Sequence, residues 1–245
     1  SAHNGMVFVR GNKNDYERWE DFGLKSWSYN KILPYFKKIE NWSGGGNQYR
    51  GSLGPLPINQ SKNNNPLFKA FLNASSEAGH KINPDMNGEY QEGFGMFDTT
   101  IHKGERASVS RYYLNPAKKR RNLNIFSNSF VEKIIFEGKK AIGVEVKIKD
   151  KVEKIYAEKE VILSGGSINS PQLLMLSGIG DSDHLKEKGI AVIQDLKGVG
   201  KNLQDHLETY IQQECKTTDT LYKYTKLIPK VMAGIQWFLS RTGPC

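Results

Sequence analysis

The stretch that decides the fold reads Val161-Ile-Leu-Ser-Gly-Gly-Ser-Ile-Asn-Ser-Pro-Gln-Leu-Leu-Met-Leu-Ser-Gly-Ile-Gly180. The apolar run Val161–Leu163 predicts a buried strand, and the residues after Gly166 predict a helix. Gly165 and Gly166 let the backbone turn sharply between the two and let a ligand approach without meeting a Cβ atom. A tight turn with no ligand is the alternative, because many α/β proteins join a strand to a helix in this way.

The ends of the predicted helix carry their own signals. Ser170 is the expected N-cap and Pro171 suits the first helical turn. Gly178 is expected to end the helix. Free amides at such an N-terminus favour a negatively charged ligand.

Upstream of this stretch, the hydrophobic period is two residues. Ile142, Val144, Val146 and Ile148 alternate with glycine, glutamate and lysine, which predicts a half-solvated strand. Turn residues on both sides predict an antiparallel meander of three strands. The expected strands are Val131–Phe136, Ile142–Ile148 and Val152–Ala157, with a further short strand at Leu123–Phe126.

The first half of the chain predicts helices separated by long loops. Pro66 at the first helical position, Asn65 before it and Gly79 at the other end delimit the clearest helix. Further helices are expected at Asn30–Asn41 and at Ala107–Leu114.

Composition limits the class of protein. The chain has 245 residues, of which 38% are hydrophobic, and no apolar run is long enough to span a membrane. Lys and Arg outnumber Asp and Glu by 35 to 26. The densest basic run, Lys118–Arg121, has no interleaved aromatic residue, so we expect general surface charge and no nucleic-acid partner. Cys215 and Cys245 have no metal-ligand spacing.

Three Asn-x-Ser sequons begin at Asn41, Asn59 and Asn73. Such triplets also arise by chance. We nevertheless expect an extracellular or secreted protein.

The longer string closely resembles the second signature of the glucose–methanol–choline (GMC) oxidoreductases, with Ser167 where alanine is usual. Asn4-Gly-Met-Val-Phe-Val-Arg-Gly11, with Asp15–Trp19 after it, resembles the end of the family's first signature. Gly104–Pro116 and Gly198–His206 are similar to two further blocks of the family. Four blocks in the right order cover nearly the whole chain. Their content of acidic, aromatic and lysine residues is most similar to that of the insect glucose dehydrogenases.

The resemblance implies an α/β, FAD-binding dinucleotide fold interleaved with a substrate-binding part. It also implies oxidation of a small alcohol or sugar by hydride transfer to the flavin, with quinone or oxygen as electron acceptor. The expected cofactor contacts are Asn4, Gly5, Met6 and Val7 beside the flavin, Val131 at the adenine, and Ser164, Gly165 and Gly166 at the nucleotide end. For three of them a structural role is the alternative: a turn cap for Asn4, packing for Met6 and core for Val131.

The resemblance also implies a division of the chain. The flavin part is expected at residues 1–60 and 106–206, and the substrate part at 61–105 and 207–245. Neither the family's Gly-x-Gly-x-x-Gly loop nor its C-terminal histidine pair is found, so we expect an internal fragment with no catalytic residue. We expect none of the histidines, including His206, to act in catalysis. A non-catalytic binding protein and an FAD-containing lyase of the same family are the alternative functions.

Overall fold

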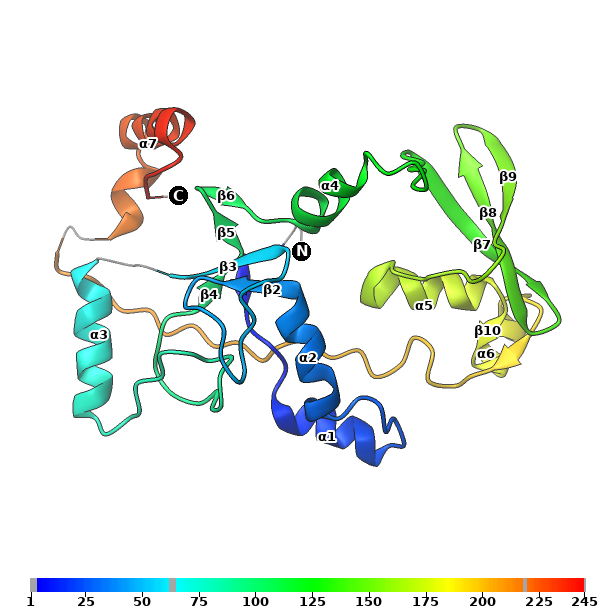
Figure 1. Cartoon of the computed structure of the whole chain (residues 1–245), viewed down its shortest axis with the longest axis horizontal. Helices are drawn as coiled ribbons and strands as arrows, with labels where there is room; N and C mark the ends of the chain where they lie inside the picture. The colour runs from blue at the N-terminus through cyan, green and yellow to red at the C-terminus, as the bar shows by residue number, and fades with distance from the viewer. Residues whose placement is uncertain (1–3, 62–64, 218–219, 245) are drawn as a thin grey trace. The chain divides into compact units, whose positions relative to one another are not determined.

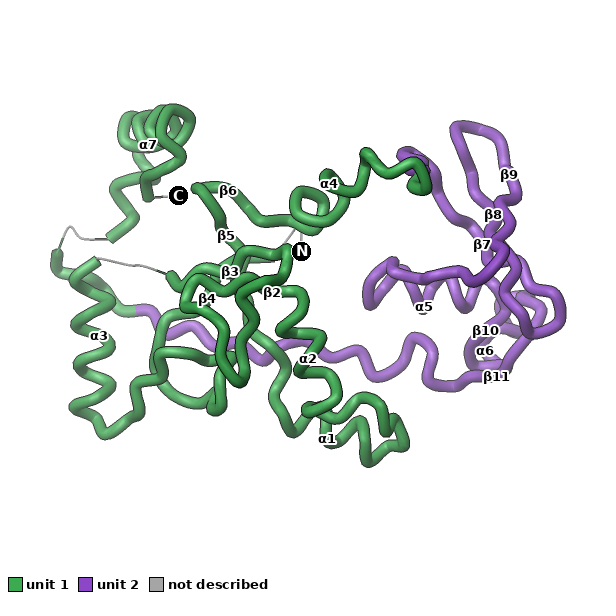
Figure 2. The backbone as a smooth tube through the Cα atoms, in the orientation of Figure 1, with its two compact units in different colours: residues 1–123, 213–245 green, residues 124–212 purple. Residues whose placement is uncertain are grey.

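The computed structural model describes residues 4–61, 65–217 and 220–244 (Figure 1). The chain divides into two compact units (Figure 2). Unit 1 contains Ser1–Leu123 and Gln213–Cys245, and unit 2 contains Asn124–Gln212. These boundaries differ from those expected for the flavin and substrate parts, whose functional assignment stays a prediction.

Unit 1 is built on a small mixed sheet with the strand order β1-β4-β3-β2. Strand β4 pairs antiparallel with β1 and β3, whereas β2 pairs parallel with β3. The strands of unit 1 are β1 (Val7–Phe8), β2 (Glu40–Trp42), β3 (Leu56–Gln60), β4 (Asp98–Thr99), β5 (Ile101–His102) and β6 (Glu105–Arg106). Its helices are α1 (Lys13–Asp21), α2 (Tyr29–Ile39), α3 (Pro66–Glu77), α4 (Asn115–Ala117) and α7 (Leu227–Ser240), with a π-helical turn at Ser110–Leu114 and a 3-10 helix at Leu221–Thr225.

The helix limits in unit 1 follow from local capping. In α3 the Asn65 side chain accepts a hydrogen bond from Leu67 N, Pro66 is the first helical residue, and Gly79 has φ +83°. The prediction for this helix is therefore confirmed. Helix α2 was expected to reach Asn41, but it stops at Ile39 because the next three residues pair with β3 as a strand.

The helix expected at Ala107–Leu114 is displaced towards the C-terminus. It begins as the π-helical turn at Ser110 and continues through Asn115 and Pro116 to Ala117. Pro116 has no N–H to donate, and it lies where the π-helical turn passes into the short helix α4.

Unit 2 contains the predicted meander. Strands β7 (Ser129–Glu137), β8 (Lys140–Ile148) and β9 (Lys151–Tyr156) form an antiparallel sheet in this order. Ile134 of β7 and Val146 of β8 are buried, and every residue of β9 is exposed. The rest of unit 2 is α5 (Gly166–Leu176), α6 (Ser182–Glu187) and a parallel pair of short strands, β10 (Ile179–Gly180) and β11 (Gln194–Asp195).

Two details of the deciding stretch differ from the sequence prediction. Residues Val161–Leu163 form no strand, and Ile162 is 77% exposed. A strand needs a partner for its backbone groups, and this segment belongs to none of the sheets of the described residues. The predicted strand at Leu123–Phe126 is also absent from the assigned elements.

Helix α5 begins at Gly166, five residues earlier than expected, with Gly165 and not Ser170 as its N-cap. Ser170 and Pro171 therefore lie inside the helix, and the Ser170 hydroxyl accepts a hydrogen bond from Gly165 N at 2.9 Å. The expected C-terminal end is confirmed, since the last helical residue is Leu176 and Gly178 has φ +90°.

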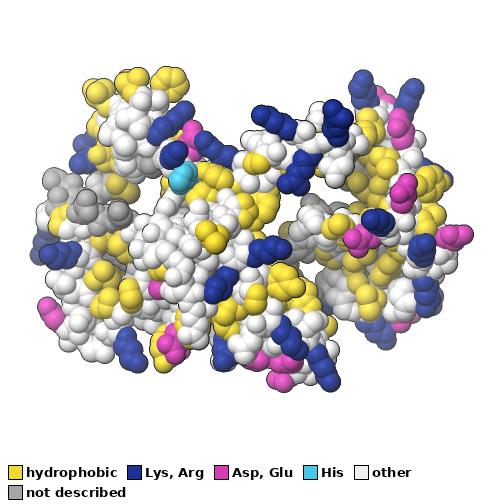
Figure 3. Space-filling model, in the orientation of Figure 1, with side chains coloured by type: hydrophobic (Ala, Val, Ile, Leu, Met, Phe, Trp, Pro, Cys, Tyr) yellow, Lys and Arg dark blue, Asp and Glu magenta, His cyan; other side chains and the backbone are white. Residues whose placement is uncertain are grey.

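Lysine and arginine side chains are spread over both units on the face shown in Figure 3, with no single basic patch. This distribution agrees with general surface charge. None of the helices among the described residues is long and apolar enough to cross a membrane.

Candidate functional site

The first group of predicted cofactor contacts lies at the edge of the unit 1 sheet. Asn4, Gly5 and Met6 lead into β1, and Val7 is its first residue. Met6 has φ +64°, an uncommon value for a residue with a side chain. Its carbonyl accepts hydrogen bonds from Thr100 N at 2.8 Å and from Thr100 Oγ1 at 3.2 Å. The Arg106 guanidinium donates to the Asn4 carbonyl at 2.8 Å, so the segment is anchored before β1 begins.

The outer face of this segment is open. Gly5 has no atom within 4 Å of the position that a Cβ would take. Val7 is 50% exposed and Val9 is 43% exposed, whereas Arg10 is buried. Alternate side chains of an extended chain point to opposite faces, so one face of the segment is apolar and accessible. Such a face can receive a planar ring.

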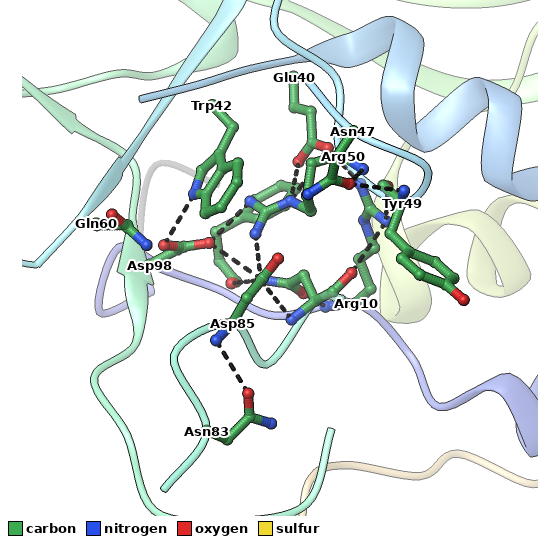
Figure 4. Close-up of polar contacts among 12 residues, drawn as sticks. Arg10, Glu40, Trp42, Asn47, Tyr49, Arg50, Gln60, Asn83, Asp85 and Asp98 are labelled. Atoms are coloured by element: carbon green, nitrogen blue, oxygen red, sulfur yellow. Dashed lines mark hydrogen bonds and ion pairs between the residues drawn. The ribbon is translucent and has the colours of Figure 1, made fainter. Parts of the chain in front are cut away.

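A buried network of charges lies behind the segment (Figure 4). The Arg50 guanidinium binds Asp98 at 2.8 Å, Asp85 at 2.5 Å and Glu40 at 3.3 Å. Arg10 forms a second ion pair with Glu40, and Trp42 Nε1 donates to Asp98 at 3.2 Å. The ring of Trp42 also lies 4.1 Å from the centre of the Arg50 guanidinium.

The network keeps charges in the protein interior. Burial lowers the pKa of Arg10, and the adjacent Glu40 acts in the opposite direction. Burial also works against the charge on Arg50, but Glu40, Asp98 and Asp85 together raise its pKa. Removing one member would leave a buried charge without its partner, which costs about 3–5 kcal/mol. The network therefore fixes the relative positions of β1, β2 and the loop before β4.

The sequence prediction missed this network. Arg10 follows the apolar run Val7–Val9, and Glu40 lies between Ile39 and Trp42. A charged residue beside apolar residues indicates a buried ion pair, and this was the signal in the sequence that could have revealed the network. It does not identify the partners, because Arg10 and Arg50 are 40 positions apart and meet only through the fold.

The second group of predicted contacts lies in unit 2. Ser164, Gly165 and Gly166 form the entry to α5, and all three are exposed. Gly166 has φ +90°, with no atom within 4 Å of the position of a Cβ. Val131 is the third residue of β7 and is half-buried. β7 and α5 are joined by Ser177, whose hydroxyl accepts from Ile134 N at 2.8 Å and donates to Leu173 O at 2.6 Å.

The predicted contacts thus fall into two sets, one in each unit: Asn4–Val7 in unit 1, and Val131 with Ser164–Gly166 in unit 2. Their role towards a cofactor stays a prediction. Each set combines an open backbone with a rigid support, which suits a large planar ligand with an anionic part.

The histidines of the described residues show no catalytic arrangement. The backbone N–H of His206 donates to the Asp205 carboxylate at 2.8 Å, and no contact joins that carboxylate to the imidazole. His80 packs against Phe94, and His102 meets the edge of Tyr112. His3 and Cys245 lie outside the described residues. No group of three or more potential metal ligands occurs in the part of the chain that the structure describes.

Comparison with known proteins gives the family. The sequence profile described as "GMC oxidoreductase" matches residues 1–208. The chain is 50% identical over 243 residues to the oxygen-dependent choline dehydrogenase of Brucella anthropi, covering 99% of this chain and 44% of that protein. It is also 50% identical over 243 residues to the mitochondrial choline dehydrogenase of Homo sapiens, covering 99% of this chain and 41% of that protein.

A solved structure agrees with these relatives. The FAD-dependent oxidoreductase from Chaetomium thermophilum is 31% identical, with a TM-score of 0.83 over 98% of this chain and 44% of that one. The chain thus spans less than half the length of the relatives that it matches. The family profile covers most of the chain, and the matches extend to almost all of it. The chain belongs to the GMC oxidoreductase family.

Proposed function

We propose that the protein containing this chain is an FAD-dependent oxidoreductase that oxidises the CH–OH group of choline. One observation carries the proposal: the chain shares 50% identity over 243 residues with choline dehydrogenases from a bacterium and from human. The sequence suggested a likeness to insect glucose dehydrogenases, with an alcohol or sugar as substrate. The sequence identity to choline dehydrogenases favours a small alcohol over a sugar as the substrate.

The residues of this chain fit the cofactor that the family uses. The open apolar face at Val7, together with the bare backbone at Gly5, suits the isoalloxazine ring. The turn at Gly165 and Gly166, followed by the N-terminus of α5, suits the anionic nucleotide end, because backbone amides at a helix N-terminus favour negative charge. When bound, FAD supplies the hydride acceptor. This chain holds and orients it, and none of its histidines is proposed as the base.

The test uses the full-length protein purified with its flavin. Anaerobic mixing with choline should bleach the visible flavin absorbance, since reduction of the cofactor removes that band. Glucose should not bleach it, and the neutral carbon analogue of choline, with the same shape but no charge, should react much more slowly. Bleaching by glucose and not by choline would overturn the proposed substrate.

A second measurement distinguishes an oxidoreductase from the two alternative functions, a non-catalytic binding protein and an FAD-containing lyase. A full flavin spectrum with no reduction by any alcohol would support a non-catalytic relative or a lyase. Where choline does reduce the flavin, reoxidation by air and by a soluble quinone would be compared. Faster reoxidation by the quinone would identify a dehydrogenase, and faster reoxidation by air an oxidase.

An extracellular location is also a proposal, supported by the three sequons. Asn41 and Asn73 are exposed. Asn59 donates its side-chain amide to the Ile101 carbonyl, and the sequon serine Ser75 is buried, so Asn41 is the best acceptor of the three. A mass shift on treatment with a glycosidase would test it.

A further inference from the structure

Asn87 binds the backbone of the signature segment with both ends of its side-chain amide. The residue is 3% exposed and lies in the loop before β4. Its Oδ1 accepts a hydrogen bond from Arg10 N at 2.7 Å, and its Nδ2 donates to Phe8 O at 3.0 Å. Two backbone groups of one segment are therefore satisfied by one side chain from a residue 77 positions away.

The Asn87 side chain makes the two hydrogen bonds that a residue of a neighbouring strand would make to Phe8 and Arg10. β1 pairs with β4 only at Val7 and Phe8. In an extended chain, the carbonyl of one residue and the N–H two residues later point to the same side. The Asn87 amide meets this pair at Phe8 and Arg10, so it takes over from β4 where the ladder stops. Gln91 supports the same end, because its Nε2 donates to Arg10 O at 2.9 Å.

Asn87 is itself fixed by the buried charge network. Its Nδ2 also approaches Asp98 Oδ2, at 3.4 Å, and its backbone N donates to Asp85 Oδ1 at 3.0 Å. Both carboxylates are held by Arg50. A carboxylate only accepts hydrogen bonds, so Asp98 requires the NH₂ end of the amide on its side. The orientation of Asn87, with its donor on Phe8 O, follows from that requirement.

We propose that Asn87 is a positioning residue for the flavin-facing segment Asn4–Val7. The inference rests on the proposed function, in which that segment contacts the isoalloxazine ring. Phe8 and Arg10 follow directly after this segment in the chain. Loss of their hydrogen bonds to Asn87 would therefore let Val7 move relative to the ring. Displacement of about 1 Å at a reacting centre can slow a reaction by about a hundredfold.

The experiment compares Asn87→Ala with wild type in the full-length flavoprotein. We expect the flavin to stay bound but its visible absorption band and its reduction potential to shift. Flavin reduction by choline should slow at least tenfold, with a larger change in kcat than in KM, because the ring and the segment are misaligned after binding. Ser75→Ala is the control: it removes another buried polar side chain of unit 1, whose hydroxyl donates to Leu72 O at 2.7 Å within its own helix. It should leave spectrum, potential and rate unchanged.

Asn87→Asp provides a second variant of the same shape, in case Asn87→Ala does not fold. It keeps the acceptor for Arg10 N but loses the donor to Phe8 O and faces the Asp98 carboxylate, so the same shifts are expected. If either folded variant keeps the wild-type spectrum, potential and reduction rate while only its melting temperature falls, Asn87 is purely structural and the inference is overturned. Failure of the proposed function has a different signature: wild type itself would carry no flavin or would not be reduced by choline.

Discussion

One residue in each of the two predicted sets of cofactor contacts, Met6 in unit 1 and Gly166 in unit 2, has a positive φ angle. Met6 adopts φ +64° and is held by two hydrogen bonds from Thr100. Gly166 adopts φ +90° with open space on its exposed side. The neighbouring Gly165 has φ −78°, which any residue can adopt. The backbone angle that favours glycine at this turn is therefore that of Gly166, whereas at Gly165 a Cβ would lie 3.3 Å from atoms of Asn169 and Ser170.

Gly166→Val should prevent flavin loading in the full-length protein. A left-handed backbone costs a residue with a side chain about 1–2 kcal/mol, and a β-branched side chain would also fill the open side of the turn. The matched control is Gly138→Val, at the hairpin between β7 and β8, where φ is +59° and the space is equally open. Both variants should lose stability, but only Gly166→Val should lose visible flavin absorbance relative to protein absorbance. A fully loaded Gly166→Val protein would make Gly166 a turn residue only.

Elements of unit 2 are joined by polar side chains as well as by apolar packing. Ser177, the residue after α5, is 1% exposed and connects this helix to β7. Asp181 caps α6, with its carboxylate accepting from Asp183 N and His184 N. Both residues lie within or directly after the family's second signature. That signature therefore positions the helix as well as the glycine turn.

Ser177→Ala should destabilise the protein by about 1–3 kcal/mol, because the buried Ile134 N–H loses its acceptor. The control is Ser167→Ala in the first turn of α5, where the serine is exposed and the change should stay within about 0.5 kcal/mol. Urea unfolding of the two variants measures the difference. Equal midpoints for both would show that the Ile134 N–H finds another partner.

The cap of α6 should depend on pH. Hydrogen bonds from His184 N and Asp183 N lower the pKa of Asp181, with smaller help from Lys201 and Lys197. The folded value is below that of the unfolded chain, so the stabilisation is complete above the ordinary aspartate pKa of about 3.9 and is lost as the pH falls through the folded value. Asp181→Asn also caps but does not titrate. Melting temperatures of the two proteins should therefore converge in acid, and a constant gap at all pH values would contradict the assignment.

At the scale of the whole molecule, the chain is two units connected by an exposed segment. Residues 201–215 form no helix or strand. Several of their apolar side chains are exposed: Leu203, Leu207, Tyr210 and Ile211. Apolar groups in this number are seldom left in water, and the relatives are more than twice as long as this chain. We expect the remaining part of the full-length protein to cover them.

Limited proteolysis tests this expectation. Trypsin should cut the 245-residue chain first after Lys201 or Lys216, because an extended exposed segment fits a protease most easily. In the full-length flavoprotein the same cuts should be much slower. Cleavage after Lys139, in the hairpin between β7 and β8, is the internal control and should change little. Equal rates at Lys201 in both proteins would show that the segment stays exposed.

Local features of the sequence determined the meander, helix α3 and the C-terminal end of α5. Period-two alternation, an Asn-Pro start and a glycine stop act over a few residues, so their outcome does not depend on the rest of the chain. The sequence motifs also determined the family. Local signals failed at Val161–Leu163, because a strand exists only where a partner binds its backbone.

Only the tertiary structure decided how the signature segment is held. Arg10, Glu40, Arg50, Asp85, Asn87 and Asp98 come from separate parts of the chain and meet behind β1. Which charges pair in a protein interior depends on burial and on distances between segments far apart in sequence, and no local pattern encodes these. The turn at Gly166 could therefore be found by reading the sequence, whereas the support provided by Asn87 required the folded chain.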